Sequence, residues 1–160
     1  MKNIVLGILF LFILSSCSTN SSEDISINLK VISNYNYNSK EIELTKLINE
    51  YRVNIGLNPL VLINHISNKC EDHNNYMITN NVINHAFFQD RSDNIRSVLG
   101  ASNVSEIVAY NYIQPQGVLD AWLNSPSHKE AIEGNFTDFG VSIIKNTDGK
   151  NYFTIIFIKR

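Results

Sequence analysis

The sequence predicts an α+β fold, a three-layer α-β-α sandwich with a central antiparallel sheet. The segment that decides this is the last one, because residues 152–158 are apolar on both faces of a strand: Tyr152, Ile156 and Ile158 on one, Phe153, Ile155 and Phe157 on the other. A strand buried on both faces needs a covering layer above and below it. Residues 146–149, Asn-Thr-Asp-Gly, predict a hairpin that joins this strand to another at 139–145.

Two long helices are predicted in the first half of the chain. Asn38 and Glu41 form a capping pair, and apolar residues follow at helical spacing to residue 55, before Gly56 and Pro59 end the helix. A second helix is expected over residues 64–80. Its buried stripe is formed by Ile66, Cys70, His73 and Met77.

Shorter elements follow. A third helix, capped by Ser92 or Asp93, is expected to end before Gly100, and a fourth to cover residues 116–123. Between them, residues 104–112 alternate as a strand that places Glu106 on the same face as Val108. A carboxylate is therefore expected to point where apolar side chains point.

The start of the chain resembles a bacterial lipoprotein signal. Lys2 precedes an apolar stretch from residue 4 to residue 14, too short to span a bilayer, and Leu14-Ser15-Ser16-Cys17 resembles a lipobox, in which cleavage precedes a lipid-bearing cysteine. We expect a signal peptide at 1–16, a lipid-anchored tether at 17–38 and one domain at 39–160. A plain secretory signal cleaved near Cys17 is the alternative.

Composition argues against a nucleic-acid-binding protein and against a domain stabilised by disulfides. The 13 basic and 15 acidic side chains are scattered, so the chain lacks the clustered basic face that nucleic-acid binding requires. Only two cysteines are present, and with Cys17 lipidated, Cys70 has no partner for an intramolecular disulfide. Cys70 is expected to be a small buried side chain.

Five short motifs between residue 47 and the end of the sequence resemble one family. They are Leu47-Ile48-Asn49-Glu50-Tyr51-Arg52 with Gly56-Leu57-Asn58-Pro59-Leu60; Asn84-His85 with Asp90-Arg91; Ser105-Glu106-Ile107-Val108-Ala109-Tyr110; Trp122 to Ser125-Pro126-Ser127-His128-Lys129; and Phe139-Gly140-Val141 with Tyr152-Phe153-Thr154. In this order they resemble the CAP domain of cysteine-rich secretory, antigen 5 and pathogenesis-related proteins, in its small bacterial form. The resemblance implies the same α-β-α fold.

The resemblance also implies a cleft with two histidines and acidic residues that takes a divalent cation, often zinc. Matched by position, the ligands are His85, His128 and Glu106, and Ser125 stands where the second acid of other members would be. Ser125 and Tyr110 are expected to line the cleft. Ser127 and Glu130 read as a capping box that places His128 at the first position of a helix, where the helix dipole favours neutral imidazole.

Two functions remain open from the sequence. The first is a membrane-anchored protein on an extracytoplasmic face of the bacterial cell envelope, which binds a cation and a lipid, peptide or cell-wall ligand. The second is a zinc-dependent, peptidase-like hydrolase in which Glu106 activates water. If Glu106 instead lies behind a histidine and orients it, only two protein ligands remain for the metal. His73 is expected to be a core or cleft-rim residue.

Overall fold

The computed structural model describes residues 30–160, and the expected signal peptide, Cys17 and most of the expected tether lie outside these residues. The elements in chain order are α1 (Ser39–Asn54), β1 (Val61–Leu62), α2 (Asn64–Asn80), α3 (Phe88–Leu99), β2 (Asn103–Tyr110), α4 (Pro115–Leu123), α5 (Pro126–Glu133), β3 (Asp138–Lys145) and β4 (Asn151–Lys159).

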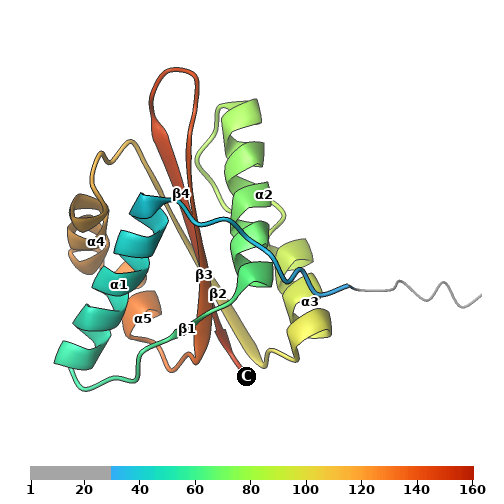
Figure 1. The fold of residues 1–160 in the computed structure, drawn as a ribbon, viewed down its shortest axis with the longest axis vertical. Helices are drawn as coiled ribbons and strands as arrows, with labels where there is room; N and C mark the ends of the chain where they lie inside the picture. The colour runs from blue at the N-terminus through green and yellow to red at the C-terminus, as the bar shows by residue number, and fades with distance from the viewer. Residues whose placement is uncertain (1–29) are drawn as a thin grey trace, which may run out of the picture.

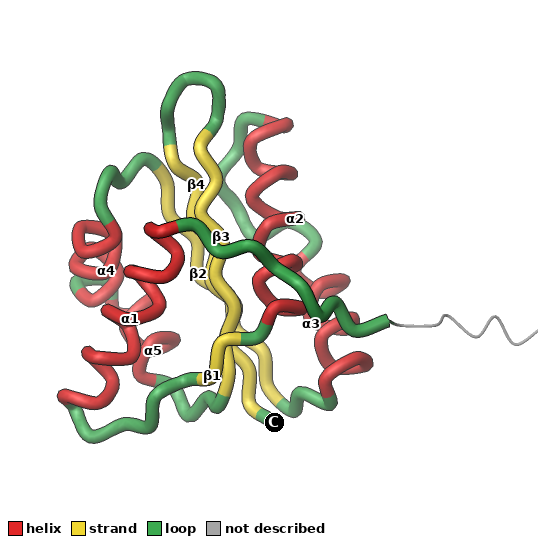
Figure 2. The backbone as a smooth tube through the Cα atoms, viewed as in Figure 1, coloured by secondary structure: helices red, strands yellow, loops and turns green. Residues whose placement is uncertain are grey.

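The three-layer sandwich is confirmed (Figures 1 and 2). Helices α1, α4 and α5 cover one face of the sheet, and α2 and α3 cover the other. The strand order is β1-β3-β4-β2, and the three long strands pair antiparallel as expected. The two-residue strand β1 pairs parallel with β3, which makes the sheet mixed. A strand this short has no alternation that a sequence pattern could reveal.

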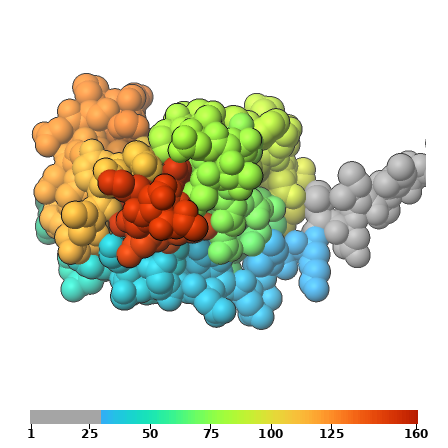
Figure 3. Space-filling view, turned by 90° about the horizontal axis from the view of Figure 1, so that it is seen from above, coloured from blue at the N-terminus to red at the C-terminus, as the bar shows by residue number. Residues whose placement is uncertain are grey.

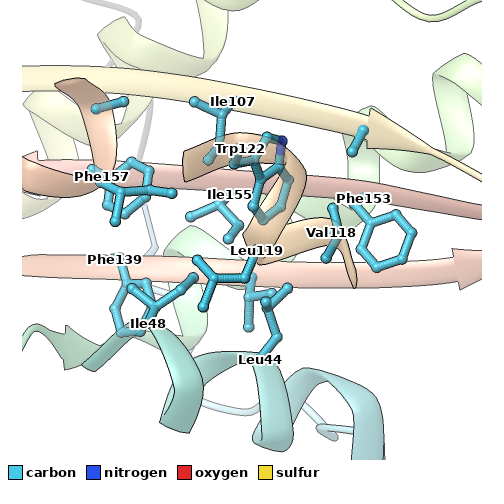
Figure 4. Packing of buried hydrophobic residues seen from close by; sticks show 14 of the residues in the cluster. Leu44, Ile48, Ile107, Val118, Leu119, Trp122, Phe139, Phe153, Ile155 and Phe157 are labelled. Atoms are coloured by element: carbon cyan, nitrogen blue, oxygen red, sulfur yellow. The ribbon is translucent and has the colours of Figure 1, made fainter. Parts of the chain in front are cut away.

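The last strand, β4, divides the core into two clusters, as its apolar faces predict. Phe153, Ile155 and Phe157 pack with α1, α4 and α5, where Trp122 is the largest buried side chain (Figure 4). On the other face, Ile156 and Ile158 pack against α2 and α3. Both faces of β4 are therefore buried, and this strand holds the two helical layers together.

Helix α1 begins with the predicted capping box. The Asn38 side chain accepts a hydrogen bond from the Glu41 N–H, and the Glu41 carboxylate accepts one from the Asn38 N–H. The same carboxylate, 2% exposed as a residue, also accepts a hydrogen bond of 2.8 Å from the N–H of Ile143 on β3. Burial raises the pKa of Glu41. The capping residue thus also fixes α1 to the sheet.

The end of the expected tether belongs to the folded domain. The N–H of Ile32 donates to Nδ1 of His65, and the hydroxyl of Tyr37 donates to Asn64 at the start of α2. Residues 32 and 37 therefore lie against the first turn of α2. This segment was expected to be a tether because it is rich in Ser and Asn. It also contains two tyrosines with specific hydrogen-bond partners, Tyr35 and Tyr37.

Two helix starts differ from the prediction. Helix α3 begins at Phe88, about one turn before the expected cap at Ser92 or Asp93, and its N-cap is Phe87 in a left-handed conformation with φ of 58°. Helix α5 begins with Pro126, so Ser125 is the N-cap and His128 is the third helical residue instead of the first. Proline is favoured at the first helical position, and this preference outweighs the Ser127–Glu130 capping box.

The β3–β4 hairpin projects at one end of the molecule. Gly149, with φ of 78°, supplies the turn that the sequence predicts. Seen from above, the hairpin fills the space between α2 and the segment that joins β2 to α4 (Figure 3). Within residues 30–160, no helix has the length and apolar character needed to cross a bilayer.

Helix α2 approaches the sheet closely at Gly140 on β3, where an added Cβ would collide with the backbone of Ile66 and Ser67. We predict that Gly140→Ala lowers the free energy of unfolding by about 1–3 kcal/mol or more, measured by urea denaturation, because neither backbone can move away. The matched control is Gly117→Ala on α4, where the nearest atom, Cδ1 of Tyr112, lies 3.9 Å away. The control should be neutral or stabilising by up to about 1 kcal/mol. Equal stability of the two variants would contradict this account of the packing.

Candidate functional site

The candidate site is built around the carboxylate of Glu106, on the α2 and α3 side of β2. Its side chain is only 1% exposed. The face it shares includes buried apolar residues such as Val104, as the strand alternation predicts. An ionised carboxylate in such a position requires cationic or hydrogen-bonding partners, because the desolvation of an unpaired charge is costly.

Arg91 on α3 provides the main partner. Its Nε donates to Oε2 of Glu106 at 2.9 Å, and its Nη2 donates to Oε1 at 2.8 Å. This is the two-point geometry in which guanidinium and carboxylate groups pair most strongly. The third nitrogen, Nη1, donates to the main-chain carbonyl of Ala86 at 2.8 Å. Arg91 therefore fixes both the carboxylate and the loop that carries His85.

His85 completes the set of groups around the carboxylate. Its Nδ1 lies 2.9 Å from Oε1 of Glu106, while the imidazole side chain is 50% exposed. A carboxylate paired with arginine is an acceptor, so Nδ1 carries the proton and donates it in this hydrogen bond. The other nitrogen, Nε2, is then left as the lone-pair nitrogen of the neutral ring.

The loop that presents His85 is held from three sides. Nε2 of buried His73 on α2 donates to the carbonyl of Asn84 at 2.8 Å, and the N–H of Ala86 donates to the Asn84 side chain. Arg91 binds the carbonyl of Ala86, and Glu106 binds the imidazole itself. The exposed His85 is thus fixed by buried groups from α2, α3 and β2.

His73 belongs to this assembly as a supporting residue. Its Nε2 also lies 3.7 Å from Oε1 of Glu106, and its side chain is fully buried. Burial lowers the pKa of His73 below its ordinary value, while the negative charge of Glu106 opposes that change. The sequence placed His73 in the core or at the cleft rim, and the structure puts it beneath the loop that ends in His85.

His128 reaches the same region from α5, across the edge strand. Its pKa is lowered by partial burial and by the positive charge that His85 carries when protonated. The two imidazoles therefore lie within electrostatic range of each other. The lowered pKa favours the neutral form of the His128 ring, although His128 is not at the helix position first expected for it.

The other expected cleft residues are less closely connected. Ser125 is the partly buried N-cap of α5, and Tyr110 is 37% exposed and packs edge-to-face on Tyr152 with ring centroids 4.8 Å apart. Within residues 30–160 neither side chain has a hydrogen bond to His85, Glu106 or His128. Asp90, the acidic residue of the second motif, is exposed on α3. The charged group that α3 contributes to the site is the guanidinium of the next residue, Arg91.

Few groups in the site are free to bind a metal. In the described part of the chain, no group of three or more His, Cys, Asp or Glu side chains has the arrangement of a metal site. Both oxygens of Glu106 accept hydrogen bonds from Arg91, and one also accepts from His85. The donors left free are the imidazoles of His85 and His128. This matches the alternative in which Glu106 orients a histidine from behind.

The sequence model of the cysteine-rich secretory protein family, CAP, matches residues 45–157. The chain belongs to the CAP family. A relative from Borreliella burgdorferi, an uncharacterised protein, is 30% identical over 115 residues, which cover 71% of this chain and 74% of the relative.

Solved structures agree with the family assignment. An outer surface protein from Borrelia burgdorferi superposes with a TM-score of 0.69 at 27% identity, covering 81% of this chain and 99% of that one. A cysteine-rich secretory protein from Staphylococcus aureus superposes with a TM-score of 0.64 at 20% identity, covering 76% of this chain and 38% of that one. This CAP chain therefore matches the borrelial protein along nearly its whole length, and the staphylococcal protein over one part of it.

The Arg91–Glu106 pair generates a prediction about stability. Arg91→Met should lower the free energy of unfolding by about 3–5 kcal/mol, because it leaves a buried carboxylate without its cation. Glu106→Gln should also destabilise. The double variant should be more stable than the sum of the two losses predicts, by roughly 1–3 kcal/mol, measured by urea denaturation.

Asp90→Asn is the control for this cycle. It changes a charge one residue from Arg91 on an exposed position, and should alter stability by less than about 0.5 kcal/mol. Losses for Arg91→Met and Glu106→Gln that simply add would mean that the two side chains do not depend on each other, and the account of the site would be wrong.

Proposed function

We propose that this protein is a non-catalytic binding module on the surface of the bacterial cell envelope, anchored through a lipid on Cys17. Its ligand binds in the cleft between His85 and His128. The observation that carries the proposal is the state of the Glu106 carboxylate, which is 1% exposed and shared between Arg91 and His85. A carboxylate held in this way orients an imidazole and presents it to solvent.

The same observation speaks against the hydrolase alternative. A general base must reach the proton of a water or substrate, directly or through one water, and must have a lone pair available for it. The Glu106 oxygens are occupied by donors from Arg91 and His85 and are shielded from solvent. Ser125, at the position of the family's second acid, has no carboxylate to replace it.

A divalent cation, with zinc as the first candidate, remains part of the proposal. The residues that would hold it are His85, through Nε2, and His128. Such a cation would polarise an oxygen atom of the bound ligand. Hydrogen bonding of Nδ1 to a carboxylate increases the basicity of the opposite nitrogen and fixes its direction, which favours metal binding at His85.

Zinc titration tests this part of the proposal. We predict that the purified protein gives a calorimetric binding signal with zinc chloride at about one ion per chain, and that His85→Ala and His128→Ala each remove it. Glu106→Gln should weaken binding by roughly 10- to 100-fold, as is usual for residues that orient a metal ligand. His65→Asn, which changes a histidine bound to Ile32 and Asn94, is the control and should leave the signal unchanged. Absence of any zinc signal in the wild type would refute the cation proposal.

The location rests on two observations. Leu14-Ser15-Ser16-Cys17 has the spacing of a lipobox after an apolar stretch, and the structural relative from Borrelia burgdorferi is described as an outer surface protein. Several acyl chains on one cysteine hold a protein on a membrane stably, because each buried methylene contributes about 0.8 kcal/mol. The domain would then lie on the outer side of the membrane that holds the lipid on Cys17.

Metabolic labelling with an alkyne-tagged fatty acid tests the anchor. The wild-type protein should take up the label in a bacterial host that modifies lipoproteins, and Cys17→Ser should not. Cys70→Ser is the matched control, since Cys70 is buried between α2 and the sheet and its thiol lies 3.5 Å from the Gly140 carbonyl oxygen. Equal labelling of the wild type and Cys17→Ser, or no labelling of either, would contradict the lipid anchor.

A further inference from the structure

The main chain of β2 lies open at the edge of the sheet, beside the candidate site. β2 is the last strand in the order β1-β3-β4-β2, so it has a strand neighbour on one side only. On its other side, α3 and α5 flank it from the two helical layers (Figure 1). An edge strand offers unpaired N–H and C=O groups at the spacing of a β-ladder.

The direction of these groups follows from hydrogen bonds at both ends of the strand pair. On β4, the carbonyl of Asn151 accepts a hydrogen bond from the N–H of Asn111, and the carbonyl of Lys159 accepts one from the N–H of Ser102; these two donors flank β2. The carbonyl of Ile158 accepts a hydrogen bond from the N–H of Thr137, which precedes β3. Odd-numbered residues of β4 therefore face β2. In the printed register they pair with odd-numbered residues of β2, so the main-chain groups of Val104, Glu106 and Val108 point outward.

Two further observations agree with this direction. The indole Nε1–H of Trp122 donates to the carbonyl of Val108 at 3.2 Å, which requires that carbonyl to point away from β4. Glu106 is partly exposed as a residue although its side chain is 1% exposed, so its accessible surface belongs to the main chain. Among the described residues, no side chain forms a hydrogen bond with the outward N–H and C=O groups of Val104 and Glu106 as Trp122 does with the carbonyl of Val108.

The open part of the edge coincides with the proposed binding site. Glu106 has His85 on the α3 side, hydrogen-bonded to its side chain, and α5, which carries His128, on the other. Next to Asn103 and Ser105, a cavity of about 400 Å³ lies between β2 and α5. Its lining is mostly polar and includes Asn103, Ser105, Ser127, Glu130 and Asn135.

We infer that the ligand of this site is an extended peptide segment, which adds to the sheet as a strand beside Val104 and Glu106. This inference rests on the proposed function and names its ligand class. The outward N–H and C=O of each of these residues match the alternating carbonyl and N–H groups of an extended peptide, which a lipid tail cannot supply. Trp122 ends the available edge at Val108, and the polar cavity receives one peptide side chain.

The test begins with amide hydrogen exchange, followed by NMR, in the purified protein. The amides of Val104 and Glu106 should exchange rapidly and those of Ser105 and Ile107 slowly, because only the latter pair with β4. Slow exchange at Val104 and Glu106 in the free protein would overturn the inference, since the edge would then already be occupied.

The second step is a screen of end-capped random heptapeptides against the same protein. Bound peptides should protect the amides of Val104 and Glu106 from exchange and shift the imidazole signals of His85. The same peptides with N-methyl groups at alternate residues should bind at least tenfold more weakly, because they lack one row of donors. Peptides that bind without protecting these amides, or that bind equally well when N-methylated, would overturn the inference.

Substitution at Val104 gives an independent readout. Val104→Pro removes an outward N–H, a change that edge strands tolerate, and should weaken peptide binding by roughly tenfold. Val104→Ala removes a similar part of the buried side chain and keeps the N–H, so any loss of binding that it causes measures the side-chain change alone and should be much smaller than the loss in Val104→Pro. If zinc shifts the His85 signals while no heptapeptide binds, the peptide assignment fails and the proposed function stands. If neither probe changes the His85 signals, both fail.

Discussion

The Glu106 carboxylate must be paired because it lies on the buried side of the edge strand, among apolar residues. Its pairing determines the local structure: Arg91 crosses from α3 to meet it, and the same guanidinium binds the carbonyl of Ala86. His73 holds the neighbouring Asn84 from α2. The result is an exposed imidazole, His85, fixed by groups that solvent does not reach. Rigid presentation of a polar side chain reduces the entropy lost when a ligand binds to it.

Under the proposed function, this arrangement favours binding over catalysis. A carboxylate that serves two buried or fixed donors has little capacity left for proton transfer, whereas the histidines keep their outward nitrogens for a ligand or cation. The edge of β2 lies between those histidines and offers main-chain groups of its own. In the proposed site, side chains from α5 and from the loop before α3 act together with main-chain groups of β2. The family fold supplies the frame, and the particular residues determine what it can hold.

Much of the fold could be predicted because it depends on local patterns. The bounds of α2, the Asn38–Glu41 capping box and the two-sided burial of β4 all follow from periodicity and capping rules. The start of α3 could not be predicted, because its N-cap is Phe87 in a left-handed conformation without a side-chain hydrogen bond. Sequence placed His85, Glu106 and His128 in one region through the family resemblance. The sequence could indicate that a buried Glu106 needs a cationic partner. It could not indicate that the partner is Arg91, because that pairing depends on the tertiary packing of α3 against β2.

The protonated nitrogen of His85 tests the central claim most directly. Long-range ¹H–¹⁵N correlation spectra recorded at about pH 8, above the range in which free imidazoles titrate, distinguish the two neutral tautomers. The account predicts that the His85 ring carries its proton on Nδ1, with Nε2 unprotonated, and that Glu106→Ala abolishes this preference. A His85 ring protonated on Nε2, or a tautomer that is unaffected by the loss of the Glu106 carboxylate, would contradict it.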